Sequence, residues 1–89
     1  MISKSMDWNE KAYRALIKAF SPMPPHIREK ALQKVIDKIE SYARNLGAKR
    51  VEFEHVYKVS KELLMSKERY MYESLINSLK SEGFRVEEL

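Results

Sequence analysis

The sequence predicts a small all-α domain of three or four helices around a single core. Its 89 residues are enough for one domain, and apolar side chains recur at three- and four-residue spacing over most of the chain. The two glycines and three prolines fall between these stretches, where helices are expected to end. Cysteine is absent, which excludes disulfides, thiolate metal sites, cysteine-ligated iron–sulfur clusters and cysteine nucleophiles.

The first helix is expected to start near Asp7 or Trp8 and to end before Pro22. Asp7 is the expected N-cap, because its carboxylate can accept hydrogen bonds from the free amides of the first turn. Apolar residues then follow at helical spacing through Leu16 to Ala19.

The second helix is expected to run from Pro25 to just before Gly47. Proline suits the first helical position, and glycine suits the left-handed residue that ends a helix. Lys30, Lys34 and Lys38 line one side of this helix, four residues apart. Like charges at this spacing repel unless a partner or counterion compensates them.

The last helical stretch lies between Glu52 and Glu82, after an extended link over residues 48–51. Glu52 is the expected N-cap, and its charge suits a helix N-terminus. Because no glycine or proline interrupts the stretch before Gly83, two alternatives remain open. It forms either one long helix or two helices broken near Ser66, which would then cap the fourth helix.

The assembly prediction depends on this choice. One long helix would carry a second apolar stripe without a partner, formed by Tyr57, Leu64, Met71, Tyr72, Leu75 and Leu79. Such a stripe predicts a homodimer, or a protein partner, bound through residues 64–82. A fold-back near Ser66 would instead bury the stripe within the chain. The predicted core is made of Trp8, Leu16, Ile27, Val35, Ile39, Ala43, Leu46, Val56, Val59 and Leu63.

Catalytic and metal-binding patterns are weak. His55 lies near Glu52 and Glu54, but a solvated histidine explains the arrangement better than a metal site. The carboxylates alternate with lysine and arginine, and no serine lies in a nucleophile motif. We therefore expect no enzyme activity, no metal and no cofactor. No signal peptide or membrane span is recognisable, so the cytoplasm is the expected location.

Charge is uneven along the chain. Of the overall net charge of +4, residues 25–50 carry seven basic and three acidic side chains, whereas residues 51–89 are net acidic. A basic middle segment is typical of a solvated helix face, but it could also attract an anion, a nucleic acid or an acidic protein.

One series of motifs is more specific. Trp8 leads an apolar helix, Pro24 precedes Arg28 by four residues, and a long helix closes with the sequence Glu40-Ser-Tyr-Ala-Arg44-Asn-Leu-Gly47. This series, over residues 8–63, resembles the small C-terminal domain of the B subunit of light-independent protochlorophyllide reductase. The resemblance implies a helical domain over residues 1–63 with a C-terminal helical extension over residues 64–89.

The resemblance implies a non-catalytic accessory or binding module, because the iron–sulfur cluster and the substrate cavity of that reductase belong to its large domains. A tetrapyrrole or a partner protein would be bound, and Arg28, Glu40 and Arg44 match the charged positions. A structural role is the alternative for them, since Glu40 and Arg44 are spaced as a helical ion pair. The chain is also similar to the second half of an archaeal histone, in which Lys49 and Arg50 would contact DNA phosphate.

Overall fold

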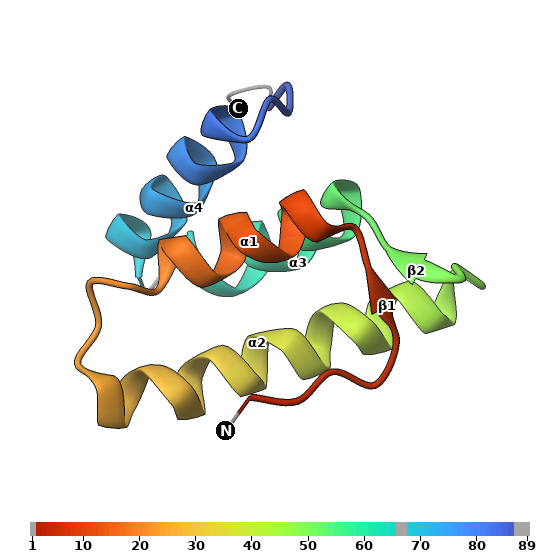
Figure 1. Cartoon of the computed structure of the whole chain (residues 1–89), viewed down its shortest axis with the longest axis horizontal. Helices are drawn as coiled ribbons and strands as arrows, with labels where there is room; N and C mark the ends of the chain where they lie inside the picture. Colours follow the sequence, from red (N-terminus) through yellow and green to blue (C-terminus); the bar gives the residue numbers. More distant parts are fainter. Residues whose placement is uncertain (1, 66–67, 87–89) are drawn as a thin grey trace.

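The computed structural model describes residues 2–65 and 68–86. Four helices form a small, mostly helical domain, as the sequence predicts, and two very short strands join it (Figure 1). The elements in chain order are β1 (Asp7–Trp8), α1 (Glu10–Ala19), α2 (Pro25–Asn45), β2 (Arg50–Val51), α3 (Phe53–Leu64) and α4 (Arg69–Ser81).

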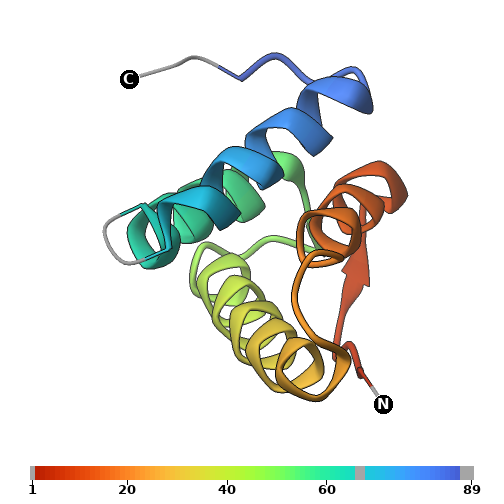
Figure 2. The same ribbon diagram turned by 90° about the vertical axis from the view of Figure 1, so that its left-hand side faces the viewer.

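The helices are stacked in layers. α1 and α3 lie between the long helix α2 and the last helix α4, and Figure 2 shows the same order after a quarter turn. α4 packs mainly against α1, and α2 packs mainly against α3. One apolar core therefore includes side chains from all four helices.

The strand pair brings the starts of two helices together. β1 and β2 are parallel, with Trp8 opposite Val51, and the Asn9 amide donates to the Val51 carbonyl at 2.8 Å. This pairing keeps the chain extended through Trp8, so the prediction that Asp7 caps the first helix was wrong. Asn9 is the N-cap instead, and its side-chain oxygen accepts from the amides of Lys11 and Ala12.

The predicted limits of α2 are confirmed. Pro25 is its first residue, and Gly47 follows its end with a φ of 76°. The left-handed conformation at Gly47 lets the chain turn back toward β1, and the Ala48 amide bonds to the Ala43 carbonyl at 3.0 Å. Local signals at both ends were enough to place this helix.

The stretch after Glu52 forms two helices, so the single long helix was wrong. α3 ends at Leu64 and α4 starts at Arg69, while the expected cap Ser66 lies outside the described residues. In α4, Met71, Leu75 and Leu79 are fully buried. The second apolar stripe is thus largely covered within the chain, which removes the reason that the sequence offered for a homodimer.

The predicted core is right at most positions. Seven of its members are buried, namely Trp8, Leu16, Val35, Ile39, Ala43, Val56 and Val59. Leu63 is half-buried, whereas Ile27 and Leu46 are 47% and 60% exposed, so these two assignments were wrong.

The geometry of the helix explains the error at Ile27. A row of residues spaced four apart drifts by about 40° per step around a helix. Between Ile27 and Ala43 the row moves about 160° around α2, so its first member faces solvent. Leu46 lies beyond the last helical residue, and the buried face of α2 includes Leu32 and Ile36 instead.

Within the described part of the chain, no helix is long and apolar enough to cross a membrane.

Two isoleucines of α2 provide a matched test of the core. Ile39→Ala is expected to lower the free energy of unfolding by about 2–5 kcal/mol, because Ile39 is fully buried. Ile27→Ala makes the same change at an exposed position and is expected to cost well under 1 kcal/mol. Urea unfolding of both variants measures the difference, and equal losses would contradict the packing of α2.

The fold-back of α4 also predicts the state of association. Because Met71, Leu75 and Leu79 are buried within the chain, we expect a monomer at tens of micromolar in analytical ultracentrifugation. A dimer at that concentration would mean that another surface mediates association.

Candidate functional site

Glu40 of α2 is a charged side chain in the interior, only 1% exposed. Its carboxylate accepts hydrogen bonds from the Ser5 amide at 2.9 Å, the Ser5 hydroxyl at 2.7 Å and the Met6 amide at 3.3 Å. The indole Nε1 of Trp8 donates a fourth at 2.9 Å. One carboxylate therefore fixes residues 5–8 against the middle of α2.

Two further side chains of α2 hold the same segment. The Gln33 side chain accepts from the Ser3 amide at 2.8 Å and donates to the Ser3 carbonyl at 2.9 Å. The Arg44 guanidinium donates to the Ser5 hydroxyl at 2.9 Å, and this hydroxyl in turn donates to Glu40. Residues 3–8, here called the N-terminal segment, are thus attached along about half of α2.

These hydrogen bonds keep Glu40 ionised. Burial by itself raises the pKa of a carboxyl group, but the donors from Trp8, Ser5 and Met6 outweigh it and hold the pKa of Glu40 below its ordinary value. A group tuned in this way is suited to holding structure and not to transferring protons near neutral pH.

The structure brings only some of the predicted site residues together. Glu40 and Arg44 meet at the N-terminal segment, where both contact the Ser5 hydroxyl. Their role there is structural, but it is formed through Ser5 and not by the direct helical ion pair that their spacing suggested. Arg28 is 16 residues before Arg44 on the same helix, about 24 Å away along the axis. Its guanidinium donates to the Ser21 carbonyl at 3.2 Å and so braces the loop between α1 and α2.

Lys49 and Arg50 lie at the other end of α2. Lys49 is exposed, while Arg50 contacts Glu52 at 2.6 Å between Nε and Oε2. This pair raises the pKa of Arg50, and the Arg50 hydrogen bond lowers the pKa of Glu52. The other Glu52 oxygen accepts from the Asn9 side chain at 3.2 Å. The guanidinium of Arg50 therefore already has an anionic partner.

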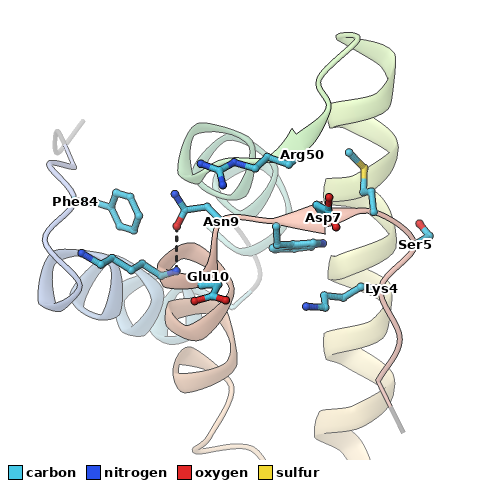
Figure 3. A pocket seen from close by; sticks show the side chains of 10 residues that line it. Lys4, Ser5, Asp7, Asn9, Glu10, Arg50 and Phe84 are labelled. Carbon is cyan, nitrogen blue, oxygen red and sulfur yellow. Dashed lines mark hydrogen bonds between the residues drawn. The ribbon is translucent and has the colours of Figure 1, made fainter.

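A broad depression of about 1080 Å³ lies beside β1 (Figure 3). The N-terminal segment, the first turn of α1, Arg50 and Phe84 line it. Trp8 forms part of its floor and also packs edge-on against Tyr13, with 5.3 Å between ring centroids. Glu40 does not line the depression, but its hydrogen bonds position Ser5, Met6 and Trp8, which do.

The depression combines three cations with two aromatic side chains, Trp8 and Phe84. Lys4, Lys11 and Arg50 are in its lining together with Phe84, and Asp7 and Glu10 are also present. Lys4 lies over the Tyr13 ring at 4.2 Å. Of these groups, sequence reasoning selected only Arg50, because the others come from chain segments that no local pattern connects.

A smaller depression of about 470 Å³ lies between the end of α2, α3 and the residues after α4. Its lining includes Tyr42 and Phe53. Nearby, His55 stacks edge-on with Tyr42 at 6.0 Å, and its Nδ1 accepts from the Glu52 amide at 2.9 Å. His55 thus serves the start of α3, and the described residues contain no cluster of three or more histidine or carboxylate groups able to hold a metal.

Comparisons with protein-family models, with curated proteins and with solved structures gave no match to this chain.

The ionised state of Glu40 predicts acid sensitivity. The pKa of Glu40 in the folded state is lower than its ordinary value of 4.5. The stability that its carboxylate contributes is therefore complete above pH 4.5, and it is lost as the pH falls through the folded-state pKa. Glu40→Gln keeps the shape but places an amide among donors, and is expected to cost at least about 2 kcal/mol at neutral pH. Urea unfolding at neutral and acid pH measures both effects.

The control is Glu62→Gln, which removes an exposed carboxylate whose ion pair within the described part of the chain is with Lys58, at 3.7 Å. This variant is expected to lose less than about 1 kcal/mol and to retain the acid sensitivity of the parent chain. If Glu40→Gln kept that sensitivity unchanged, Glu40 would not be its source.

Proposed function

We propose that the chain is a cytoplasmic, non-catalytic binding module that holds an anionic, partly apolar small ligand in the depression beside β1. The observation that carries this proposal is the gathering of Lys4, Lys11 and Arg50 around the same surface as the Phe84 ring. A tetrapyrrole carboxylate, the ligand class that the resemblance implies, has the matching chemistry of a flat apolar ring system with acidic side groups.

The cations would bind the carboxylates of the ligand, and the Phe84 ring would contact its flat apolar part. Lysine and arginine donors form strong charge-assisted hydrogen bonds with carboxylates, and an aromatic side chain offers a face or edge to a flat ligand. Phe84 is supported by Phe53, with 4.8 Å between ring centroids, so its position in the depression is braced by α3. Lys11 has no ion pair with another described residue, which leaves its charge available.

The non-catalytic part of the proposal follows from how the buried carboxylate is used. Glu40 is surrounded by donors that hold the N-terminal segment, and its lowered pKa disfavours a role as a general acid. Its effect on the depression is to position Trp8 and the residues before it.

Histone-like DNA binding through Lys49 and Arg50 stays a prediction. Arg50 is already paired with Glu52, and the carboxylate of Glu54 follows closely along the chain. These acidic groups weaken the attraction of phosphate to this loop. Because Arg50 is paired, the small-ligand proposal depends mainly on Lys4 and Lys11, which line the depression and form no ion pair with another described residue.

Titration with protoporphyrin IX tests the module. Trp8 is the only tryptophan and lies in the lining, so quenching of its fluorescence reports binding at this depression, together with a shift of the porphyrin absorbance band. The double change Lys11→Gln and Phe84→Ala is expected to weaken binding at least about tenfold, because a charge-assisted bond and a ring contact are lost.

The matched control is Lys61→Gln with Tyr70→Ala, which removes one lysine and one aromatic ring away from the depression. Tyr70 is 60% exposed, and Lys61 lies on α3 over the Tyr57 ring. This control is expected to bind like the parent chain. Absence of quenching at high micromolar porphyrin, or equal weakening in both double variants, would reject the proposed site.

A further inference from the structure

The outward face of α2 carries a row of cations that takes no part in holding the fold. Lys30, Lys34 and Lys38 are exposed and follow one another four residues apart. None of the three forms a hydrogen bond or ion pair with another described residue. We call these three residues the α2 lysine row, and none of them lines the depression beside β1.

In α3 and α4, exposed cations form ion pairs along the same helix. In α3, Lys58 pairs with Glu62 at 3.7 Å, and in α4 Arg69 pairs with Glu73 at 3.7 Å, each at the favourable four-residue spacing. On α2 the corresponding positions after Lys30 and Lys34 are again lysines. The repulsion in this row is therefore built into the longest helix of the chain and is not relieved by it.

The carboxylates of α2 near the row are directed to other partners. Asp37 accepts from the Gln33 side chain at 2.9 Å, and Gln33 also holds Ser3. Glu40 is buried against the N-terminal segment. Only Glu40 is directed into the fold, while Glu29 and Asp37 are exposed near the row. The three lysines therefore keep an excess of positive charge on this helix, which an external anion can neutralise.

We propose that the α2 lysine row binds the phosphate backbone of a nucleic-acid duplex without sequence preference. The row is about 12 Å long with a step of about 6 Å along the helix axis. A polyphosphate presents charges at short, regular intervals, and lysines neutralise them as point charges. This surface is separate from the small-ligand depression, so the inference goes beyond the proposed function.

Other anionic partners fit the row less well. A protein interface is depleted in lysine and depends on buried aromatic or arginine anchors, which this face lacks between Lys30 and Lys38. A membrane-binding helix needs a broad apolar face beside its lysines. Ile27 is the one large apolar side chain of α2 that is exposed near the row among the described residues, whereas Leu32 and Ile36 are buried in the core.

Fluorescence anisotropy with a labelled 20-base-pair duplex tests the inference, at 50 and at 200 mM salt. Neutralisation of three phosphates predicts that the association constant falls roughly 40-fold between these concentrations, from a log–log slope of about −2.7. Changing all three lysines of the row to glutamine is expected to weaken binding more than tenfold at the lower salt and to flatten the slope. A second duplex of unrelated sequence is expected to bind equally well.

The control changes Lys18, Lys58 and Lys61 to glutamine. Both triple variants lower the net charge from +4 to +1, so they match in charge, and the control additionally removes the ion pairs of Lys18 with Glu82 and of Lys58 with Glu62. The control is expected to keep most of the affinity and the slope. Circular dichroism is expected to show that the lysine-row variant melts no lower than the parent chain, since its lysines hold nothing in the fold.

Four results would overturn the inference: no binding of the parent chain at 50 mM salt, equal weakening in both triple variants, loss of binding on Lys49→Gln alone, or binding of polyglutamate or phosphatidylserine vesicles as tight as that of the duplex. The first two remove the row as a binding surface. The third moves the contact to the loop before β2, and the fourth assigns the row to another class of partner. None of these results bears on the porphyrin titration.

Discussion

The structure depends on one buried carboxylate. Glu40 collects four hydrogen bonds from the N-terminal segment, and this fixes the path of the chain into β1. β1 then pairs with β2, which places Asn9 where it caps α1 and also contacts Glu52 at the start of α3. Two helices that are far apart in sequence therefore begin side by side, and the depression is formed in front of them (Figure 3). Protonation of a single group would weaken this whole arrangement.

Polar contacts also hold α4 against α1. Glu82, just after α4, accepts from Arg14 at 3.2 Å and from Lys18 at 3.4 Å, and the Arg14 hydrogen bond lowers the pKa of Glu82. The Ser74 hydroxyl donates to the Ala19 carbonyl at the end of α1 at 3.2 Å. These polar contacts align a helix whose main stabilisation is the burial of Met71, Leu75 and Leu79. The burial of these three side chains within the chain covers most of the apolar stripe of α4.

The parts of the fold that local chemistry determines were predictable from sequence. Pro25 and Gly47 set the ends of α2 because each acts through its own backbone conformation. The strand pair was not predictable, since two residues carry no periodicity and their pairing joins positions 43 apart in the chain. The motif resemblance singled out Glu40 and Arg44. Their hydrogen bonds to Ser5, and the depression that Trp8 lines, depend on the tertiary fold and have no local sequence signal. Ile27 shows the limit of pattern reading, because a four-residue row leaves the buried face over several turns.

In this domain, acidic side chains stabilise the fold, whereas the α2 lysine row is exposed and makes no polar contact with another described residue that stabilises it. Glu40, Glu52 and Glu82 have lowered pKa values because each holds a different chain connection, namely the N-terminal segment, the start of α3 and the end of α4. Acidic groups therefore bear on the fold at three places, and their charge is matched by nearby donors. The α2 lysine row holds nothing and its members repel one another, so it opposes the fold slightly. A helix that is fixed by its other face can tolerate such a row, and the cost of keeping it is small beside the core that α2 buries. The longest helix can therefore expose an uncompensated positive charge, while Glu40, Glu52 and Glu82 connect segments of the chain by hydrogen bonds.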